Sequence, residues 1–235
     1  MARKPRFVRT GEPVHVTARG VNRSALFRHG FDKRKYLARL ALVAQQEGVE
    51  IHGYCLLDNH VHFLLVPARP DALARLFLRL HTWWAQRCNK LCRRSGHLFQ
   101  SRFHSAVLDS IHYFAAMRYI DANPRAARLV SNPADFEFSS ARAHLTGQPD
   151  QFLLLMMANW RHRFSNDPAR YREFLTESPR EEQQRLEKSL RNGLPLGSAQ
   201  WIARLEHDAQ RRLQPAPRGR PPARCLHARS NESLA

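Results

Sequence analysis

A short apolar run that contains a histidine, Val61–Val66, places the strongest constraint on the fold of this chain. The run is rich in β-branched and aromatic residues, follows a turn and ends at Pro67, which is typical of a buried β-strand. Because side chains alternate across a strand, His60 and His62 point to the same face. We therefore expect a rigid strand that presents two imidazoles side by side.

Other segments extend this strand into a pattern of strands and helices. Strands are predicted at 14–19, 49–57, 60–66 and 104–108, and helices at 32–47, 71–94 and 110–123, the last ended by Pro124. This order is the ferredoxin-like pattern with one additional helix. The predicted fold class is therefore α+β, with an antiparallel sheet and helices on one face. We expect the hairpin of 49–57 and 60–66 to lie near the sheet centre.

The chain has 235 residues, which is enough for one domain of about 150 residues and a smaller region. The composition changes after residue 147. We expect a first domain over 1–147 that carries the motifs discussed below, and a small C-terminal helical region over 148–213. The segment 214–235 is rich in proline and arginine and is predicted to be a disordered basic tail.

The net charge of +18 favours a polyanionic partner, nucleic acid before membrane. Residues 1–147 hold 23 of the 38 Lys and Arg residues but only half of the acidic ones. The sequence shows no signal peptide and no apolar run of about 20 residues. The four cysteines form no CxxC pair, so we expect a reduced, cytoplasmic protein without a membrane partner. A basic protein with no specific partner is the alternative.

Asn123 follows Tyr119 by four residues, on one face of the last predicted helix. Two imidazoles form half of a divalent-metal site, an amide oxygen is a further ligand, and a tyrosine offers a phenol nucleophile. Neutral imidazole suits Mn²⁺, Zn²⁺ or Co²⁺, whereas Mg²⁺ prefers oxygen ligands. Each motif alone also fits a structural role: metal-free histidines, or a core tyrosine followed by a helix-ending asparagine.

Basic side chains in the first domain supply the predicted DNA contacts. Two lie at the first turn, six along the second long helix and two near the remaining motifs: Arg19, Arg23, Arg75, Arg79, Arg87, Lys90, Arg93, Arg94, Arg102 and Arg125. They would contact phosphates while exposed aromatic rings stack on unpaired bases. A solvated helix face explains the basic residues of the helix equally well.

Four segments, 51–65, 96–103, 118–127 and 135–140, carry a family resemblance. The first holds the histidine pair and the third reads RYIDANPRAA. Together they resemble REP-associated tyrosine transposases, which belong to the single-tyrosine HUH transposases of bacterial insertion sequences. The resemblance spans roughly residues 5–147 in the family's order, and several motifs together are more specific than one. It departs at Asp58, and at Asp121 and Ala122, where Glu-Leu is usual.

The resemblance implies that 1–147 is an HUH catalytic domain. It implies His60, His62 and Asn123 as ligands of a divalent metal, Mg²⁺ or Mn²⁺, and Tyr119 as the nucleophile. The implied substrate is single-stranded DNA, often a hairpin, and the implied intermediate is a 5′-phosphotyrosine. A tyrosine ester keeps the phosphodiester energy, so strand transfer would need no ATP.

Two other functions remain open at this point. The first is another HUH enzyme, a replication initiator or a relaxase, although the tyrosine of relaxases usually precedes the histidine motif. The second is a catalytically silent, domesticated DNA- or RNA-binding protein, which the presence of Tyr119 and both histidines argues against. The sequence leaves the oligomeric state open between monomer and homodimer.

Overall fold

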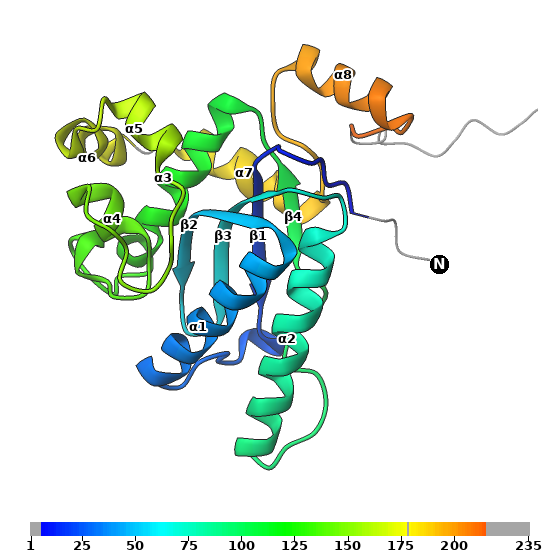
Figure 1. Ribbon diagram of the computed structural model, residues 1–235, viewed down its shortest axis with the longest axis vertical. Helices are drawn as coiled ribbons and strands as arrows, with labels where there is room; N and C mark the ends of the chain where they lie inside the picture. Colours follow the sequence, from blue (N-terminus) through cyan, green and yellow to red (C-terminus); the bar gives the residue numbers. More distant parts are fainter. Residues whose placement is uncertain (1–5, 178, 215–235) are drawn as a thin grey trace, which may run out of the picture.

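The computed structural model describes residues 6–177 and 179–214 (Figure 1). The first part of the chain contains β1 (Val14–Arg19), η1 (Val21–Arg23), α1 (Gly30–Glu47), β2 (Val49–Leu56), β3 (His60–Pro67), α2 (Ala72–Leu91), β4 (His104–Val107) and α3 (Ser110–Ala126). The second part contains η2 (Pro133–Asp135), α4 (Ala141–Thr146), α5 (Ala158–Phe164), α6 (Pro168–Thr176), α7 (Arg180–Asn192) and α8 (Ala199–Ala209). The predicted strands and long helices are therefore present.

The four strands form one antiparallel sheet in the order β2-β3-β1-β4. This topology confirms the ferredoxin-like α+β class. One expectation is wrong, because β2 is an edge strand of this sheet and only β3 of the hairpin lies at the centre. The reason is that β1, which is distant in sequence, pairs with both β3 and β4. Pairing on both sides holds β3 rigid.

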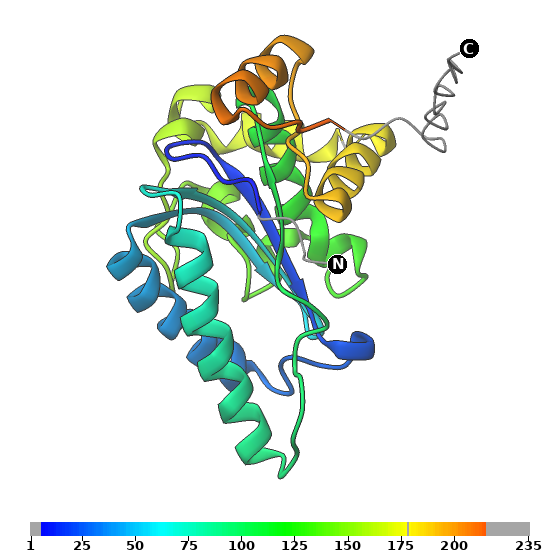
Figure 2. The ribbon, with the colours of Figure 1, turned by 90° about the vertical axis from the view of Figure 1, so that its right-hand side faces the viewer.

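The sheet lies between two layers of helices (Figure 2). As predicted, α1 and α2 cover one face, through a core that includes Tyr36, Trp84 and Phe63. The expectation that all helices cover one face is wrong for α3. This helix packs on the opposite face of the sheet, in a second core that includes Leu64. Successive residues of β3 thus enter different cores, which explains why the run is apolar on both sides of the strand.

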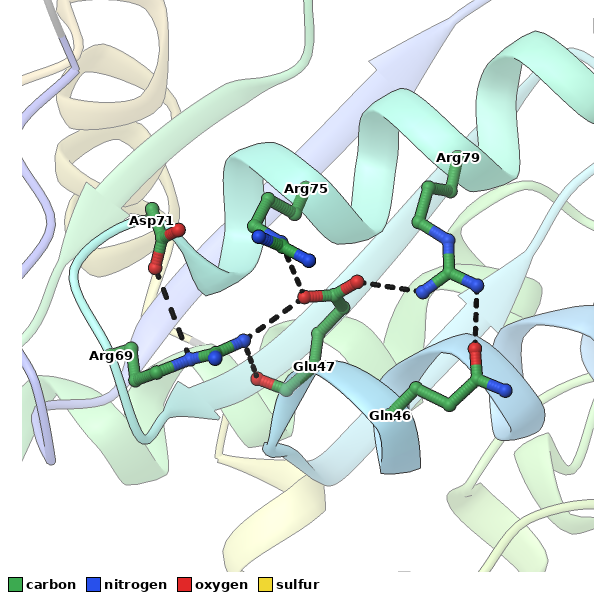
Figure 3. Close-up of polar contacts among 6 residues, drawn as sticks. All are labelled: Gln46, Glu47, Arg69, Asp71, Arg75 and Arg79. Carbon is green, nitrogen blue, oxygen red and sulfur yellow. Dashed lines mark hydrogen bonds and ion pairs between the residues drawn. The ribbon is translucent and has the colours of Figure 1, made fainter.

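A buried carboxylate joins the end of α1 to the start of α2. Glu47 precedes Gly48, whose φ of 64° ends the helix. Its carboxylate accepts hydrogen bonds from Arg79 at 2.7 Å, Arg75 at 2.8 Å and Arg69 at 3.0 Å (Figure 3). These bonds, led by that from Arg79, hold the pKa of Glu47 below its ordinary 4.5, although burial opposes them. The cluster therefore stabilises the fold while Glu47 is ionised.

Glu47→Gln is expected to lower the melting temperature by about 4 °C or more, because three arginines lose a shared anion. Since the folded-state pKa lies below 4.5, this stabilisation is present above pH 4.5 and is lost as the pH falls through the folded-state value. Thermal unfolding at pH 7 and at decreasing pH should show the gap between wild type and variant closing. Asp71→Asn is the control, since its 3.9 Å contact with Arg69 is exposed. An equal loss in both variants would contradict this role of Glu47.

α3 begins as predicted and ends later than predicted. Asp109 Oδ1 accepts the His112 backbone N–H at 2.9 Å and caps the helix. The expectation that Pro124 ends the helix is wrong, because α3 continues to Ala126 with Pro124 inside. Pro124 has no backbone N–H, so the helix lacks the one hydrogen bond that this residue would donate. The Ala127 N–H still donates to the Asn123 carbonyl oxygen at 2.8 Å. The helix therefore remains regular through Asn123.

The region predicted as a helical appendage, 148–213, is helical and shares the second core with α3. Trp160, Tyr171 and Leu186 come from α5, α6 and α7, and all three are buried in the same cluster as Ile120 of α3. No helix within 6–177 and 179–214 is long and apolar enough to cross a bilayer. Residues 215–235 of the predicted tail lie outside the described residues.

A second buried carboxylate ties α3 to this C-terminal region. Asp121 is fully buried and accepts hydrogen bonds from Ser140 Oγ at 2.6 Å and Tyr171 Oη at 2.5 Å. Its other contact is with His144, whose Nδ1 lies 2.6 Å from Asp121 Oδ2. Paired in this way, a buried carboxylate is satisfied. The network connects α3 with α4 and α6, and it steadies the helix that carries Tyr119.

Candidate active site

The histidine pair lies on the sheet face that α3 covers. In the pairing of β1 with β3, His60 is opposite Arg19 and His62 is opposite Thr17. The two imidazole ring centroids are 5.0 Å apart and the ring planes are nearly perpendicular. His62 is 5% exposed, whereas His60 is half-buried beside the β2–β3 turn, where its Nδ1 lies 2.6 Å from Asn59 Oδ1. The central strand thus presents both rings to α3.

α3 brings Tyr119 to this pair of rings. The Tyr119 ring centroid lies 5.5 Å from that of His62, in an edge-to-face arrangement. Asn123 is buried one turn further along, and its Nδ2 donates a hydrogen bond to the Tyr119 carbonyl oxygen at 2.7 Å. The fold therefore gathers the predicted nucleophile and the predicted histidines on one face, with Asn123 held against the backbone of Tyr119.

A third histidine, which the sequence analysis did not single out, completes this face. His15 of β1 is fully buried, and its Nε2 lies 3.2 Å from Nδ1 of His62. Its ring centroid is 5.7 Å from that of Tyr119. Alternation along β1 places His15 on the same face as Thr17. Only the pairing of β1 with β3, however, brings that face beside His62.

Burial keeps the three histidines neutral. It lowers the pKa of His15 to about 3, and burial followed by the charge of Arg19 lowers the pKa of His60 to about 4. The pKa of His62 falls well below 6.5, first through burial and then through the neighbouring His15 and His60. A neutral imidazole has a free nitrogen lone pair, which is the form that binds a metal.

The donor set fits a divalent metal that accepts nitrogen and oxygen ligands. His60 and His62 are neutral. The amide nitrogen of Asn123 donates a hydrogen bond to the helix backbone, so the amide oxygen is the atom that can bind a metal. Among the described residues no three His, Cys, Asp or Glu side chains form a metal-binding group. A metal here would therefore depend on two histidines with the Asn123 amide as the third ligand, a mixed set that suits Mn²⁺.

Helix α7 contacts the candidate nucleophile from the C-terminal region. The Tyr119 hydroxyl donates a hydrogen bond to Glu187 Oε1 at 3.3 Å. The preceding residue, Arg118, forms an ion pair with Glu182 of the same helix. Burial, and then Glu187, raise the pKa of Tyr119 above its ordinary 10, so the phenol is protonated at neutral pH. The sequence carries no local signal for these contacts, because they require α7 to fold back onto α3.

Two of the predicted DNA contacts lie beside the histidine pair. Arg19 is exposed at the end of β1, opposite His60, and the following turn carries Arg23. A Cβ atom on Gly20 would lie 2.1 Å from the Ser24 carbonyl oxygen, so this tight turn requires glycine. The end of β1 and this turn therefore supply two exposed cationic side chains near His60.

The structure separates six of the other predicted DNA contacts from the histidines. Those on or directly after α2 lie across the sheet: Arg75, Arg79, Arg87, Lys90, Arg93 and Arg94. Arg75 and Arg79 are paired with Glu47, and Arg94 Nε donates to Asn89 Oδ1 at 2.9 Å. Arg102 is exposed just before β4, and Arg125 lines a cavity of about 340 Å³ with Arg172. Amphipathic spacing alone does not reveal which sheet face a helix covers.

Comparison with known proteins identifies the first domain. Residues 11–123 match the family model of IS200-like transposases. This range begins before β1 and ends at Asn123, so it includes the histidine pair and Tyr119. No curated protein matches the sequence.

Two solved structures are similar to this chain. The chain is similar to a REP-associated tyrosine transposase bound to a REP hairpin, with a TM-score of 0.52 and 19% identity over 62% of this chain and 86% of that one. A transposase candidate from Deinococcus radiodurans R1 gives a TM-score of 0.34 and 20% identity over 52% of this chain and 96% of that one. The first comparison shows a shared fold. Over residues 11–123, this chain is therefore similar to the family of IS200-like transposases.

Proposed function

We propose that this protein is a metal-dependent transposase that cleaves and rejoins single-stranded DNA, with Tyr119 as its nucleophile. The observation that carries the proposal is the position of the Tyr119 ring, 5.5 Å from the ring of His62. A phenol beside two neutral imidazoles on a rigid strand combines a nucleophile with the ligands of an activating metal. The match of residues 11–123 to a transposase family supports the same chemistry.

His60, His62 and Asn123 would hold the metal, Mg²⁺ or Mn²⁺, which when bound would polarise the scissile phosphate and offset negative charge in the transition state. The chain prepares these ligands in advance. Burial keeps His60 and His62 neutral, so no proton has to leave before they coordinate. The bond from Asn123 to the Tyr119 carbonyl orients its amide.

Tyr119 forms the new bond to phosphorus through its phenolic oxygen, and the bond from phosphorus to the 3′ oxygen of the preceding nucleotide breaks. Glu187 accepts a hydrogen bond from this hydroxyl and is in position to receive the phenolic proton. The departing 3′ oxygen takes up a proton, which leaves a 5′-phosphotyrosine and a free 3′-hydroxyl. Attack by another 3′-hydroxyl reverses these steps and rejoins the strand.

The proposed substrate is single-stranded DNA next to a hairpin. Arg19 and Arg23 would contact its phosphates near the histidine pair, because Arg19 is opposite His60 at the end of β1 and Arg23 lies in the turn that follows. The solved transposase with the same fold is bound to a REP hairpin, which supports a hairpin substrate for this chain.

A binding protein that does not cleave is the second candidate, favoured by the raised pKa of Tyr119, because burial and then Glu187 disfavour the phenolate that would attack phosphorus. Covalent capture separates the two functions. A hairpin oligonucleotide with single-stranded flanks is incubated with the protein and Mn²⁺, and the products are run on a denaturing gel. A 5′-phosphotyrosine retains a 3′-end label on the protein and releases a 5′-end label. Binding without any adduct would contradict the proposed enzyme and support the second candidate.

Arg19→Gln is expected to weaken binding of single-stranded DNA about 3- to 10-fold at moderate salt and to make the salt dependence shallower by about 0.7. Fluorescence anisotropy across a range of salt concentrations measures both quantities. Arg161→Gln on α5 removes the same charge from another exposed position and serves as the control. Equal effects of both substitutions would show that net charge, rather than a contact near the site, governs binding.

A further inference from the structure

His15 is a buried polar side chain between two apolar neighbours in the sheet. On the sheet face that it shares with α3, its directly paired neighbours are Leu64 of β3 and Ala106 of β4. It is fully buried, and burying an imidazole costs free energy unless a hydrogen bond compensates. The hydrogen-bonding partner in the described structure is His62, at 3.2 Å between ring nitrogens. Packing alone therefore does not account for a histidine at this position.

The atoms that face each other define a direction for this bond. Nδ1 of His62 faces Nε2 of His15, so Nε2 of His62 remains as its other nitrogen. A histidine binds a metal through the nitrogen that carries no proton, and its second nitrogen then donates its N–H to a neighbour. Metal binding through Nε2 of His62 thus requires the N–H on Nδ1, with His15 Nε2 as acceptor.

This arrangement places the proton of His15 on its own Nδ1. Nδ1 of His15 is buried and has no hydrogen-bond partner among the described residues. An unpaired buried N–H is unfavourable. Unfavourable local arrangements persist at functional sites, where they hold a neighbouring group, here His62, ready for its role. The ring of His15 also lies 5.7 Å from that of Tyr119, so the same side chain supports both the ligand and the candidate nucleophile.

We propose that His15 is a positioning residue that holds His62 in the ring orientation and tautomer needed to bind a divalent metal through Nε2. The inference rests on the proposed function, because it concerns the metal site described there. It adds a residue of β1 to a site otherwise built from β3 and α3. Mutation of a residue that hydrogen-bonds to a metal ligand typically weakens metal affinity about 10- to 100-fold.

Two substitutions at position 15 separate positioning from packing. His15→Leu fills the site with an apolar side chain and removes the acceptor atom Nε2. His15→Gln keeps a polar atom near the position of Nε2. Both are made in the Tyr119→Phe background, so that no DNA cleavage occurs, and Mn²⁺ affinity is measured from the EPR signal of the free ion. We expect His15→Leu to bind Mn²⁺ about 10- to 100-fold more weakly and His15→Gln to recover most of this loss.

A measurement on the unmodified chain makes the test independent of how well a variant folds. Long-range ¹H–¹⁵N spectra of the metal-free protein report the tautomer of each histidine, and His62→Gln identifies the signals of His62. We expect the His62 ring to carry its proton on Nδ1. A ring that is predominantly protonated on Nε2 would overturn the proposed role of His15.

The outcomes also distinguish this proposal from the proposed function. Normal Mn²⁺ binding by His15→Leu, or equal losses in His15→Leu and His15→Gln with thermal unfolding unchanged, would overturn only the role of His15. Failure of the wild-type chain to bind Mn²⁺ would overturn the metal site itself and this role with it. Weaker binding in His15→Leu with recovery in His15→Gln supports both.

Discussion

Tyr119→Phe is expected to abolish the covalent protein–DNA adduct, a loss of at least about 1,000-fold. The substitution removes only the phenolic oxygen that would bond to phosphorus, and it keeps the ring that packs against His62. Because the hydroxyl bonds to Glu187 at an exposed position, folding and DNA binding should change little. Denaturing gels with a 3′-labelled hairpin oligonucleotide measure the adduct, and anisotropy measures binding.

Tyr113→Phe is the matched control on the same helix. The Tyr113 hydroxyl lies 2.9 Å from Nδ1 of His52, and both residues are buried. Its removal should lower the free energy of unfolding by about 1 kcal/mol and leave adduct formation intact. If Tyr119→Phe still forms a 5′-linked adduct, another residue is the nucleophile and the proposed site is wrong.

His60→Ala, or chelation of divalent metal in the wild-type protein, is expected to lower cleavage at least about 100-fold. His60 contributes one of the two neutral imidazoles, and it is half-buried at the strand end, so its loss should leave the fold intact. Cleavage rates measured against Mn²⁺ concentration should show partial recovery of His60→Ala at high metal. A metal site with lowered affinity is occupied again when the Mn²⁺ concentration is raised.

The response to added metal separates the two proposed roles. Tyr119→Phe should not recover at any Mn²⁺ concentration, because no metal replaces a missing oxygen nucleophile. Binding of single-stranded DNA in the presence of a chelator should be similar for His60→Ala and the wild-type chain. Full cleavage by the wild-type protein without divalent metal would show that His60 and His62 have a different role.

The sequence predicts the fold well wherever the signal is local. Alternation marks β1, an apolar run between a turn and Pro67 marks β3, the capping residue Asp109 marks the start of α3, and Gly48 marks the end of α1. These signals arise from steric and hydrogen-bonding preferences within a few residues. The ferredoxin-like class follows from the order of such elements, and both the topology and the structural match agree with it.

Predictions fail where they depend on contacts between segments distant in sequence. The hairpin alone does not show that β1 inserts beside β3 and leaves β2 at the edge. Pro124 is a helix-ending signal in isolation, but the buried turn around it continues the helix. The spacing along α2 also does not show that Arg75 pairs with the buried Glu47 from the neighbouring helix.

The sequence by itself determined the elements and their order, and it singled out His60, His62, Tyr119 and Asn123 as candidate site residues, because these signals lie in short segments of the chain. Only the tertiary structure decided which groups surround them. Strand pairing brings His15 to His62, and the return of α7 brings Glu187 to the Tyr119 hydroxyl. Such contacts join residues 47 and 68 positions apart, and they arise from burial of two cores on opposite faces of one sheet rather than from any local pattern.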